Sequence, residues 1–357
     1  MLTFYSAFAK ILNKAHKNPG ETIEISQGWG RFLKDDIYAQ NDYPEFDRAI
    51  MDGYCISSKD VKRVSGFICV SEIYAGQEPR LKLKRGQCAY ISTGAKVPRG
   101  SDCVIKKEDC RFFDNKVFFS KKPKKGENIA SKGLDFKKGE LLLEKGEKLA
   151  IAKIALLASQ GFNKIKVNRL ANIAVLSTGD EVVEAGRRKK GAQIWNTSAP
   201  MLLASLKKLG TPFSYLGIAR DDENDLFKKI KSGFFDILII TGAVSEGKKD
   251  HVPGILKRLG FKIVFHKVAV RPGKPLLFAV KGRRFVFGLP GNPVSSMVSF
   301  LLFVLPFIKK TIGDASAHLW EEGLLSAPVC NRTERFSFFP AKVEGRYIKP
   351  LKYSGSG

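Results

Sequence analysis

The chain contains 357 residues, of which 61 are basic and 35 acidic, and its formal charge is +26. This length exceeds that of one ordinary core and predicts two to four domains. A charge of this size indicates either that the protein binds anionic ligands or that its source organism favours basic residues in general. Because the basic residues are dispersed, and their short clusters at 121–125 and 187–190 hold no aromatic side chains, we expect no nucleic-acid partner.

Cysteine spacing and hydropathy indicate the compartment. None of the six cysteines forms a pair with two-residue spacing, and no histidine lies near enough for a zinc signature, so we expect reduced thiols. The amino terminus does not read as a signal peptide. The longest apolar stretch, 297–308, contains Pro306 and is predicted to be too short to cross a bilayer. We therefore expect a soluble cytoplasmic protein with no membrane partner.

The first half of the chain shows a helical pattern followed by β-rich patterns. Residues 1–40 begin with an apolar helical face. Residues 44–120 alternate short β-rich runs with glycine and charged residues, which is typical of a small β-rich domain. A lysine-rich loop at 121–125 precedes a predicted helix over 151–159 and a predicted strand over 164–167.

From residue 171 onward, apolar runs alternate with helical patterns, which predicts a doubly wound α/β domain. Three apolar runs end in glycine turns that carry hydroxyls, acids or a base, at 177–181, 241–250 and 289–296. Buried parallel strands read as continuous apolar runs, and ligands of open α/β sheets bind outside their carboxyl ends. The three turns therefore predict pieces of one anion-binding pocket.

The first two turns also have ordinary structural interpretations. Taken alone, the 177–181 turn is more typical of a capped strand-to-helix turn than of a metal site. In the second turn, Gly242, Ser245 and Gly247 could cradle a phosphate through backbone N–H groups, or the segment could be a common βα loop. Asp250 could hold a metal or cap the next helix.

A cationic group follows, because Lys267, Arg271 and Lys274 fall within eight residues, next to Pro275. Alternation in an extended strand would place Lys267 and Arg271 on one face. A solvated charge run is the usual alternative. The neighbouring prolines and glycine favour a shaped turn, and a guanidinium suits bidentate oxygen ligands, so the segment predicts an oxyanion site.

Taken together, these stretches resemble the molybdopterin molybdenumtransferase family, which includes the carboxyl-terminal part of gephyrin. Any single motif is common, but seven in this order over nearly the whole chain are specific. The motifs are Pro44-Glu45-Phe46-Asp47, Met51-Asp52-Gly53-Tyr54, Thr93-Gly94-Ala95, Gly179-Asp180-Glu181, the segment 242–250, Pro272-Gly273-Lys274-Pro275 and Leu289-Pro290-Gly291-Asn292-Pro293.

The resemblance implies an α/β, multidomain, elongated protomer that forms a homodimer with its active site across the dimer. The expected domains are an elongated linker domain (1–43 and 121–168), a small β-rich domain (44–120), a molybdopterin-binding α/β domain (169–313) and a short, incomplete C-terminal β domain (314–357). Two departures from the family pattern are Arg271, where a lysine is usual, and Ala243, where a glycine is usual.

The resemblance also implies an activity: insertion of molybdate into adenylylated molybdopterin, with release of AMP and with magnesium assisting. By position it implies catalytic roles for Asp52, Thr93, Asp135, Glu181 and Asp250. It implies that substrate is bound by Gly242, Ser245, Gly247, Lys267, Arg271, Lys274, Pro275 and Ser295.

Magnesium also follows from electrostatics. Carboxylates beside a diphosphate repel it, at a cost of about 4 kcal/mol per like-charge pair at ~4 Å and an effective dielectric constant of ~20. A bound Mg²⁺ reverses that sign by bridging the two kinds of oxygen. We therefore expect Glu181, Asp221 and Asp250 to hold Mg²⁺.

Three other functions stay open at this point. The first is the preceding step, adenylylation of molybdopterin by ATP; the enzyme of that step could also be a partner protein. The second is a non-catalytic scaffold that binds the pterin. Nucleic-acid binding comes third, because only the net charge supports it.

Overall fold

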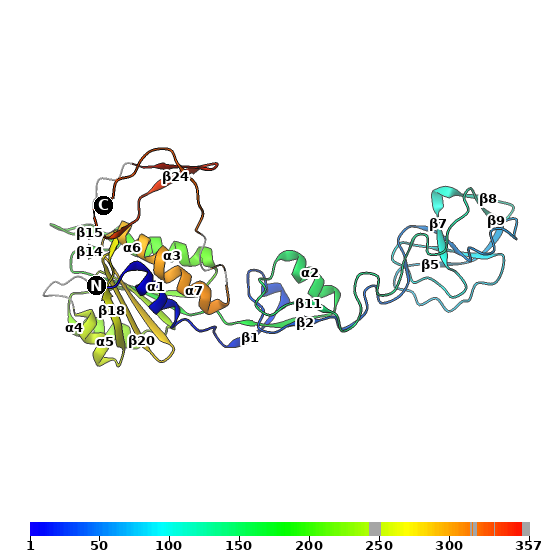
Figure 1. Ribbon diagram of the computed structural model, residues 1–357. Helices are drawn as coiled ribbons and strands as arrows, with labels where there is room; N and C mark the ends of the chain where they lie inside the picture. Colours follow the sequence, from blue (N-terminus) through cyan, green and yellow to red (C-terminus); the bar gives the residue numbers. More distant parts are fainter. Residues whose placement is uncertain (243–250, 315, 317–319, 332, 352–357) are drawn as a thin grey trace. The chain divides into compact units, whose positions relative to one another are not determined.

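The structure is a computed structural model that describes residues 1–242, 251–314, 316, 320–331 and 333–351 (Figure 1). Its contacts divide the chain into two compact units, which are described separately. Unit 1 comprises Met1–Ile23, Gly28–Lys34 and Lys166–Gly357, and unit 2 comprises Glu24–Gln27 and Asp35–Ile165.

A six-stranded mixed sheet forms the centre of unit 1. Its strand order is β16 (Phe213–Ala219), β13 (Ile173–Thr178), β17 (Ile237–Thr241), β21 (Arg284–Leu289), β20 (Pro275–Lys281) and β18 (Lys262–Lys267). The first four strands are parallel, and β20 is antiparallel to both of its neighbours. The apolar runs therefore form parallel strands, and β20 and β21 form an antiparallel hairpin through Gly282 and Arg283.

Helices cover both faces of this sheet (Figure 1). One face carries α1 (Phe4–Leu12), α3 (Ser198–Leu209), α6 (Pro293–Ser299) and α7 (Leu305–Ile312), and the other carries α4 (Glu223–Ser232) and α5 (Val252–Arg258). Alternate residues of each central strand enter opposite cores: Ile239 packs with the first group of helices and Ile240 with the second. Burial on both faces explains why these strands lack a polar face.

Helix α1 belongs to the core of unit 1. Phe4, Ala7 and Ile11 are buried in the same cluster as Phe303 and Phe307, which lie in the helix Pro293–Ile312. The apolar face recognised in the sequence therefore packs against residues almost 300 positions away, although we had assigned this segment to the linker domain. The division into four domains stays a prediction.

The segment Pro293–Ile312 is one continuous helix of 20 residues, in which a π-helical turn, Phe300–Val304, joins α6 to α7. Such a turn tolerates Pro306, which lacks a backbone N–H. The helix is long and apolar enough to cross a membrane, so the prediction that this stretch is too short was wrong. In unit 1 it is a core helix, since Phe300, Phe303 and Phe307 are fully buried against the sheet.

Unit 2 is built on a second six-stranded sheet. Its order is β7 (Cys103–Lys106), β4 (Gly53–Ile56), β6 (Gln87–Ile91), β5 (Phe67–Ile73), β9 (Lys116–Phe119) and β8 (Cys110–Phe113). Only β5 and β6 pair in parallel among these strands. Burial is the main cause that raises the pKa of Cys55, Cys103 and Cys110 to about 12, so these thiols stay protonated and act as packing groups.

The remaining strands and the helix α2 are short, as are two 3-10 helical turns, Ile25–Gln27 and Lys107–Asp109. These strands and the helix are β1 (Gly20–Glu24), β2 (Ile37–Tyr38), β3 (Arg48–Ala49), β10 (Ile129–Ala130), β11 (Leu141–Leu143), α2 (Ile151–Ser159), β12 (Lys164–Asn168), β14 (Val182–Val183), β15 (Ile194–Trp195), β19 (Val270–Arg271), β22 (Leu324–Leu325), β23 (Phe336–Ser337), β24 (Ala341–Glu344) and β25 (Tyr347–Pro350). Strand β23 pairs with β19, and β22, β25 and β24 form a three-stranded sheet.

Candidate functional site

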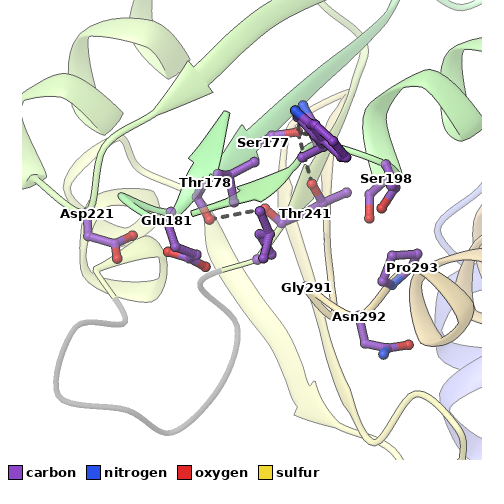
Figure 2. Close-up of a pocket in the computed structure, with 16 residues that line it drawn as sticks. Ser177, Thr178, Glu181, Ser198, Asp221, Thr241, Gly291, Asn292 and Pro293 are labelled. Carbon is purple, nitrogen blue, oxygen red and sulfur yellow. Dashed lines mark hydrogen bonds between the residues drawn. The ribbon is translucent and has the colours of Figure 1, made fainter. Parts of the chain in front are cut away.

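A cavity of about 400 Å³ opens at the carboxyl ends of the parallel strands of unit 1 (Figure 2). Strand register places these ends together, because Ser177 lies opposite Thr241 and Thr241 lies opposite Leu289. All three glycine turns recognised in the sequence contribute to its wall. The lining residues are Ser177, Thr178, Gly179, Glu181, Val182, Ile194, Trp195, Asn196, Thr197, Ser198, Asp221, Thr241, Gly242, Gly291, Asn292 and Pro293.

Gly242 occupies a position that no other residue fits. Its φ is +88°, and a Cβ atom there would lie 2.6 Å from the Thr178 hydroxyl oxygen and 2.7 Å from the Thr178 carbonyl oxygen. Its backbone N–H donates to the carbonyl of Leu289 at 3.2 Å. The turn after β17 is therefore pressed against the ends of both neighbouring strands, which holds the cavity wall in place.

The buried floor of the cavity is a chain of hydroxyl and amide groups. The Asn196 side-chain amide donates to the hydroxyls of Ser177 at 3.1 Å and Tyr215 at 2.8 Å, and the Thr241 hydroxyl donates to Ser177 at 3.2 Å. Tyr215 in turn donates to the Glu184 carboxylate at 2.6 Å. These mutual bonds satisfy the polar groups of the floor and fix their orientation.

Two helices begin at the cavity. Helix α6 starts at Pro293, and the side chain of Asn292 accepts the backbone N–H of Ser295 at 3.1 Å. Helix α3 starts at Ser198, and the Asn196 side chain accepts the Ala199 N–H at 3.2 Å. Helix N-termini carry partial positive charge and attract anions, so the two ends favour a negatively charged ligand.

Two predicted metal ligands line the same cavity. Figure 2 shows the side chains of Glu181 and Asp221 next to each other at one end of it. Asp180 accepts the backbone N–H of Asp221 at 3.2 Å, which ties the turn after β13 to the turn after β16. The third predicted ligand, Asp250, lies outside the described residues. No group of three or more metal-binding side chains occurs within the described part of the chain.

The predicted cations lie at the same sheet edge but on other strands. Lys267 ends β18 and pairs with Pro275 at the start of β20, and Lys274 directly precedes β20. Val268 and Val270 are fully buried, and Arg271, the next residue, is exposed. This alternation is what an extended strand predicts. Strands lie ~4.8 Å apart, so β18 is roughly 10 Å from β21. None of these cations is among the described residues that line the cavity.

The loop that carries these cations packs against α6. A Cβ atom at Gly273 would lie 2.8 Å from the Ser299 hydroxyl. Ser295, a predicted substrate ligand on the same helix, is 7% exposed, and its backbone N–H is already bonded to Asn292. Ser245 and Gly247, the other predicted ligands of the central turn, fall outside the residues that the structure describes.

The remaining predicted catalytic residues belong to unit 2. Asp52 accepts hydrogen bonds from both the backbone N–H and the hydroxyl of Thr93, each at 2.7 Å. The hydroxyl bond is the largest cause that lowers the pKa of Asp52. Asp135 is exposed, and its backbone N–H donates to the carbonyl of Tyr43 at 3.0 Å. The structure thus joins Asp52 and Thr93 directly.

Sequence reasoning missed several residues of the site, among them Trp195, Asn196 and Tyr215. Trp195 and Asn196 line the cavity, and Tyr215 supports its floor. The one available signal was the segment from 194 to 198, where an apolar pair is followed by polar residues just before a helix. Tyr215 gave no signal, because a single tyrosine inside a strand is ordinary.

Comparisons with known proteins show the family of this chain. Residues 2–161 match the MoeA N-terminal region (domain I and II), and residues 174–310 match a probable molybdopterin binding domain. Among solved structures, a molybdopterin biosynthesis MoeA protein from Pyrococcus horikoshii is similar over 100% of this chain and 91% of its own, with a TM-score of 0.85 and 33% identity.

Curated relatives are similar over most of their length. The molybdopterin molybdenumtransferase of Haemophilus influenzae is 33% identical over 317 residues, which is 88% of this chain and 78% of that protein. The protein of the same name from a Nostoc species is 36% identical over 311 residues, 84% of this chain and 71% of its own. The chain therefore belongs to the molybdopterin molybdenumtransferase family of transferases.

Proposed function

We propose that this protein inserts molybdate into adenylylated molybdopterin in molybdenum cofactor biosynthesis, with release of AMP and with the assistance of Mg²⁺. One observation carries the proposal. In a chain of this family, a single cavity combines the N-termini of two helices with the carboxylates of Glu181 and Asp221. We also propose that the enzyme works in the cytoplasm.

The cavity has the properties that a phosphate-bearing substrate requires. Its volume of about 400 Å³ lies within the usual range for small-molecule sites. The helix ends at Ser198 and Pro293 favour anionic oxygens, and the glycines of the strand turns let a ligand approach the backbone closely. The hydrogen-bonded floor keeps the polar groups oriented before a substrate arrives, which lowers the cost of binding.

The residues present fit a magnesium ion. Mg²⁺ in phosphate-transfer sites is commonly held by one or two carboxylates together with substrate phosphates. Glu181 and Asp221 would supply those carboxylates, and Asp250 is the proposed third. A magnesium ion there would neutralise charge on the phosphoanhydride and polarise it.

The cations at the edge of the sheet are proposed to bind oxyanions. Lys274 and Arg271 are exposed beside the carboxyl end of β18, and the packing of Gly273 against α6 connects their loop to the helix that enters the cavity. Charge-assisted hydrogen bonds of this type contribute roughly 1.5–3 kcal/mol each. We propose that these two side chains bind molybdate or a phosphate group of the substrate.

We further propose a homodimer in which the active site combines residues of two copies. Asp52 and Thr93 belong to unit 2, and Glu181 and Asp221 belong to unit 1. A second copy of the chain would bring the first pair to the cavity of its neighbour. Asp52, held by two hydrogen bonds from Thr93, would then present a fixed carboxylate to the reacting groups.

The proposal is tested by AMP release from adenylylated molybdopterin. Glu181→Gln removes one charge of the cavity with little change in shape, and we expect it to abolish AMP release without unfolding the protein. The matched control is Glu140→Gln, since Glu140 is exposed and lies in unit 2. Equal turnover in both variants rejects the carboxylate assignment. Pyrophosphate formed from ATP and molybdopterin would instead identify an adenylyltransferase.

A further inference from the structure

An exposed tryptophan forms part of the cavity wall. Trp195 lies on β15, which pairs with β14 in parallel; the Ile194 N–H donates to the Glu181 carbonyl at 2.8 Å, and the Asn196 N–H donates to the Val183 carbonyl at 2.7 Å. These bonds hold Trp195 beside the cavity, yet half of its surface is exposed to solvent. A large aromatic side chain left open in a cavity indicates a ligand contact.

The indole is held in one orientation before any ligand binds. Its Nε1–H donates to the carbonyl oxygen of Arg187 at 3.1 Å. The ammonium of Lys189 lies 4.0 Å from the ring centroid, which is a cation–π contact. One face of the ring is therefore covered by Lys189, and its polar edge is bonded, so the exposed surface belongs mainly to the opposite face.

The cavity offers two kinds of surface to a ligand. Ile194 and Trp195 are both exposed, and together they form an apolar stretch of wall. The other lining side chains are mainly hydroxyls, amides and carboxylates. A ligand that fills both parts has a flat apolar portion and an anionic portion. Basic side chains at 187–190, all exposed on the β14–β15 connection, increase the local attraction for anions.

We propose that Trp195 determines specificity by stacking, through the face opposite Lys189, on a flat nitrogen heterocycle of the substrate. This inference rests on the proposed function, because it concerns the same cavity. The substrate proposed there contains two such heterocycles, a pterin and an adenine, and they share the chemistry that an indole face recognises. Stacking needs no particular hydrogen-bond pattern, so the ring system itself is what Trp195 selects.

Binding of ring-bearing probes tests the proposal directly. AMP and 6-hydroxymethylpterin are titrated separately against the wild type, Trp195→Phe and Trp195→Leu, and affinity is measured by calorimetry. We expect Trp195→Leu to weaken one of the two probes by roughly tenfold or more, as is usual for the loss of a stacked aromatic. Trp195→Phe should restore most of that loss. The probe that weakens identifies which heterocycle stacks.

Controls separate stacking from general damage. Trp29→Leu removes another exposed tryptophan of unit 1, outside the cavity lining, and should leave both affinities unchanged. In the double variant Trp29→Phe/Trp320→Phe, Trp195 is the only tryptophan left, and its fluorescence should be quenched by the same probe. Unchanged affinities for both probes in Trp195→Leu overturn the proposal.

The failure of this inference is distinguishable from the failure of the proposed function. If the wild type releases AMP from adenylylated molybdopterin and Trp195→Leu shows the same KM, the stacking role is wrong and the function stands. If Trp195→Leu weakens a probe but the wild type releases no AMP, the stacking role stands and the proposed reaction is wrong. In the expected result, Trp195→Leu raises KM more than it lowers kcat.

Discussion

The hydroxyl of Thr178 donates a hydrogen bond to the carbonyl oxygen of Thr241, 3.1 Å away, where the two central parallel strands of unit 1 end. This bond joins β13 to β17 one residue before Gly242, whose backbone passes directly over Thr178. The cavity wall therefore depends on a close approach of two chain segments, and changes that add atoms there should disturb it.

Gly242→Ala tests this approach. The alanine Cβ would meet two oxygens of Thr178 at distances below 3 Å, in a backbone conformation with φ of +88°. The matched control is Gly210→Ala, at φ of +67°, where nothing lies within 4 Å of the added atom. We expect Gly210→Ala to cost about 1 kcal/mol from the backbone alone, and Gly242→Ala to cost an additional ~1–3 kcal/mol from overpacking. Urea unfolding measures both; equal costs contradict the close approach.

Tyr215→Phe should change how stability responds to alkaline pH. The pKa of Tyr215 is raised above its ordinary value of 10.0. Burial is the largest cause, and the hydrogen bond to Glu184 is the second. A raised folded-state pKa gives stability that is fully present below pH 10 and is lost as the pH rises through the folded value. The wild type should therefore lose more stability above pH 10 than Tyr215→Phe does. Parallel pH profiles of the unfolding free energy would show that Tyr215 is not the responsible group.

Thr93→Val should raise the pKa of Asp52 toward its ordinary value of 3.8. The Thr93 hydroxyl is the largest cause of the lowered pKa, and the Thr93 backbone N–H, which the valine keeps, is the second. A lowered folded-state pKa gives stability that is present above the ordinary value and is lost as the pH falls through the folded one. Carbon-detected NMR titration of the Asp52 carboxyl measures the shift. Thr93→Ser, which keeps a hydroxyl, should titrate like the wild type; a shift as large as that of valine argues against the hydrogen bond.

Mixing two inactive variants tests whether the active site combines two copies. Asp52→Ala and Glu181→Gln should each be inactive alone. If the site takes Asp52 from one copy and Glu181 from the other, every mixed dimer contains one intact site. After subunit exchange at equal amounts, activity should recover to about a quarter of the wild-type value, since half of the dimers are mixed. No recovery, with mixed dimers demonstrated by native mass spectrometry, contradicts a shared site.

The sequence predicted those parts of the fold that depend on local pattern. The apolar runs at 173–178 and 237–241 form parallel strands, and the turns that follow them meet at one cavity. This succeeded because a strand buried on both faces has a simple signature, and because parallel strands end at the same edge. The family resemblance, confirmed by the comparisons, followed from the order of these turns together with the motifs at 44–54, 93–95 and 272–275.

What the sequence did not predict depends on contacts between distant or unusual segments. The basic cluster at 187–190 itself holds no aromatic residue, but the pairing of β14 with β15 brings Lys189 onto Trp195, six positions further along the chain. The π-helical turn Phe300–Val304, which accommodates Pro306 without ending the helix Pro293–Ile312, was not predicted. At α3, the Asn196 side chain accepts the Ala199 backbone N–H from a position outside the helix.

We propose that this protein releases AMP as it inserts molybdate. The most direct test of this claim is AMP formation from purified adenylylated molybdopterin, measured with and without molybdate and with and without Mg²⁺. We predict AMP release that requires Mg²⁺ and increases with molybdate concentration until it saturates. Tight binding of the adenylylated pterin with no AMP formed under any of the four conditions would contradict the claim and indicate a pterin-binding scaffold.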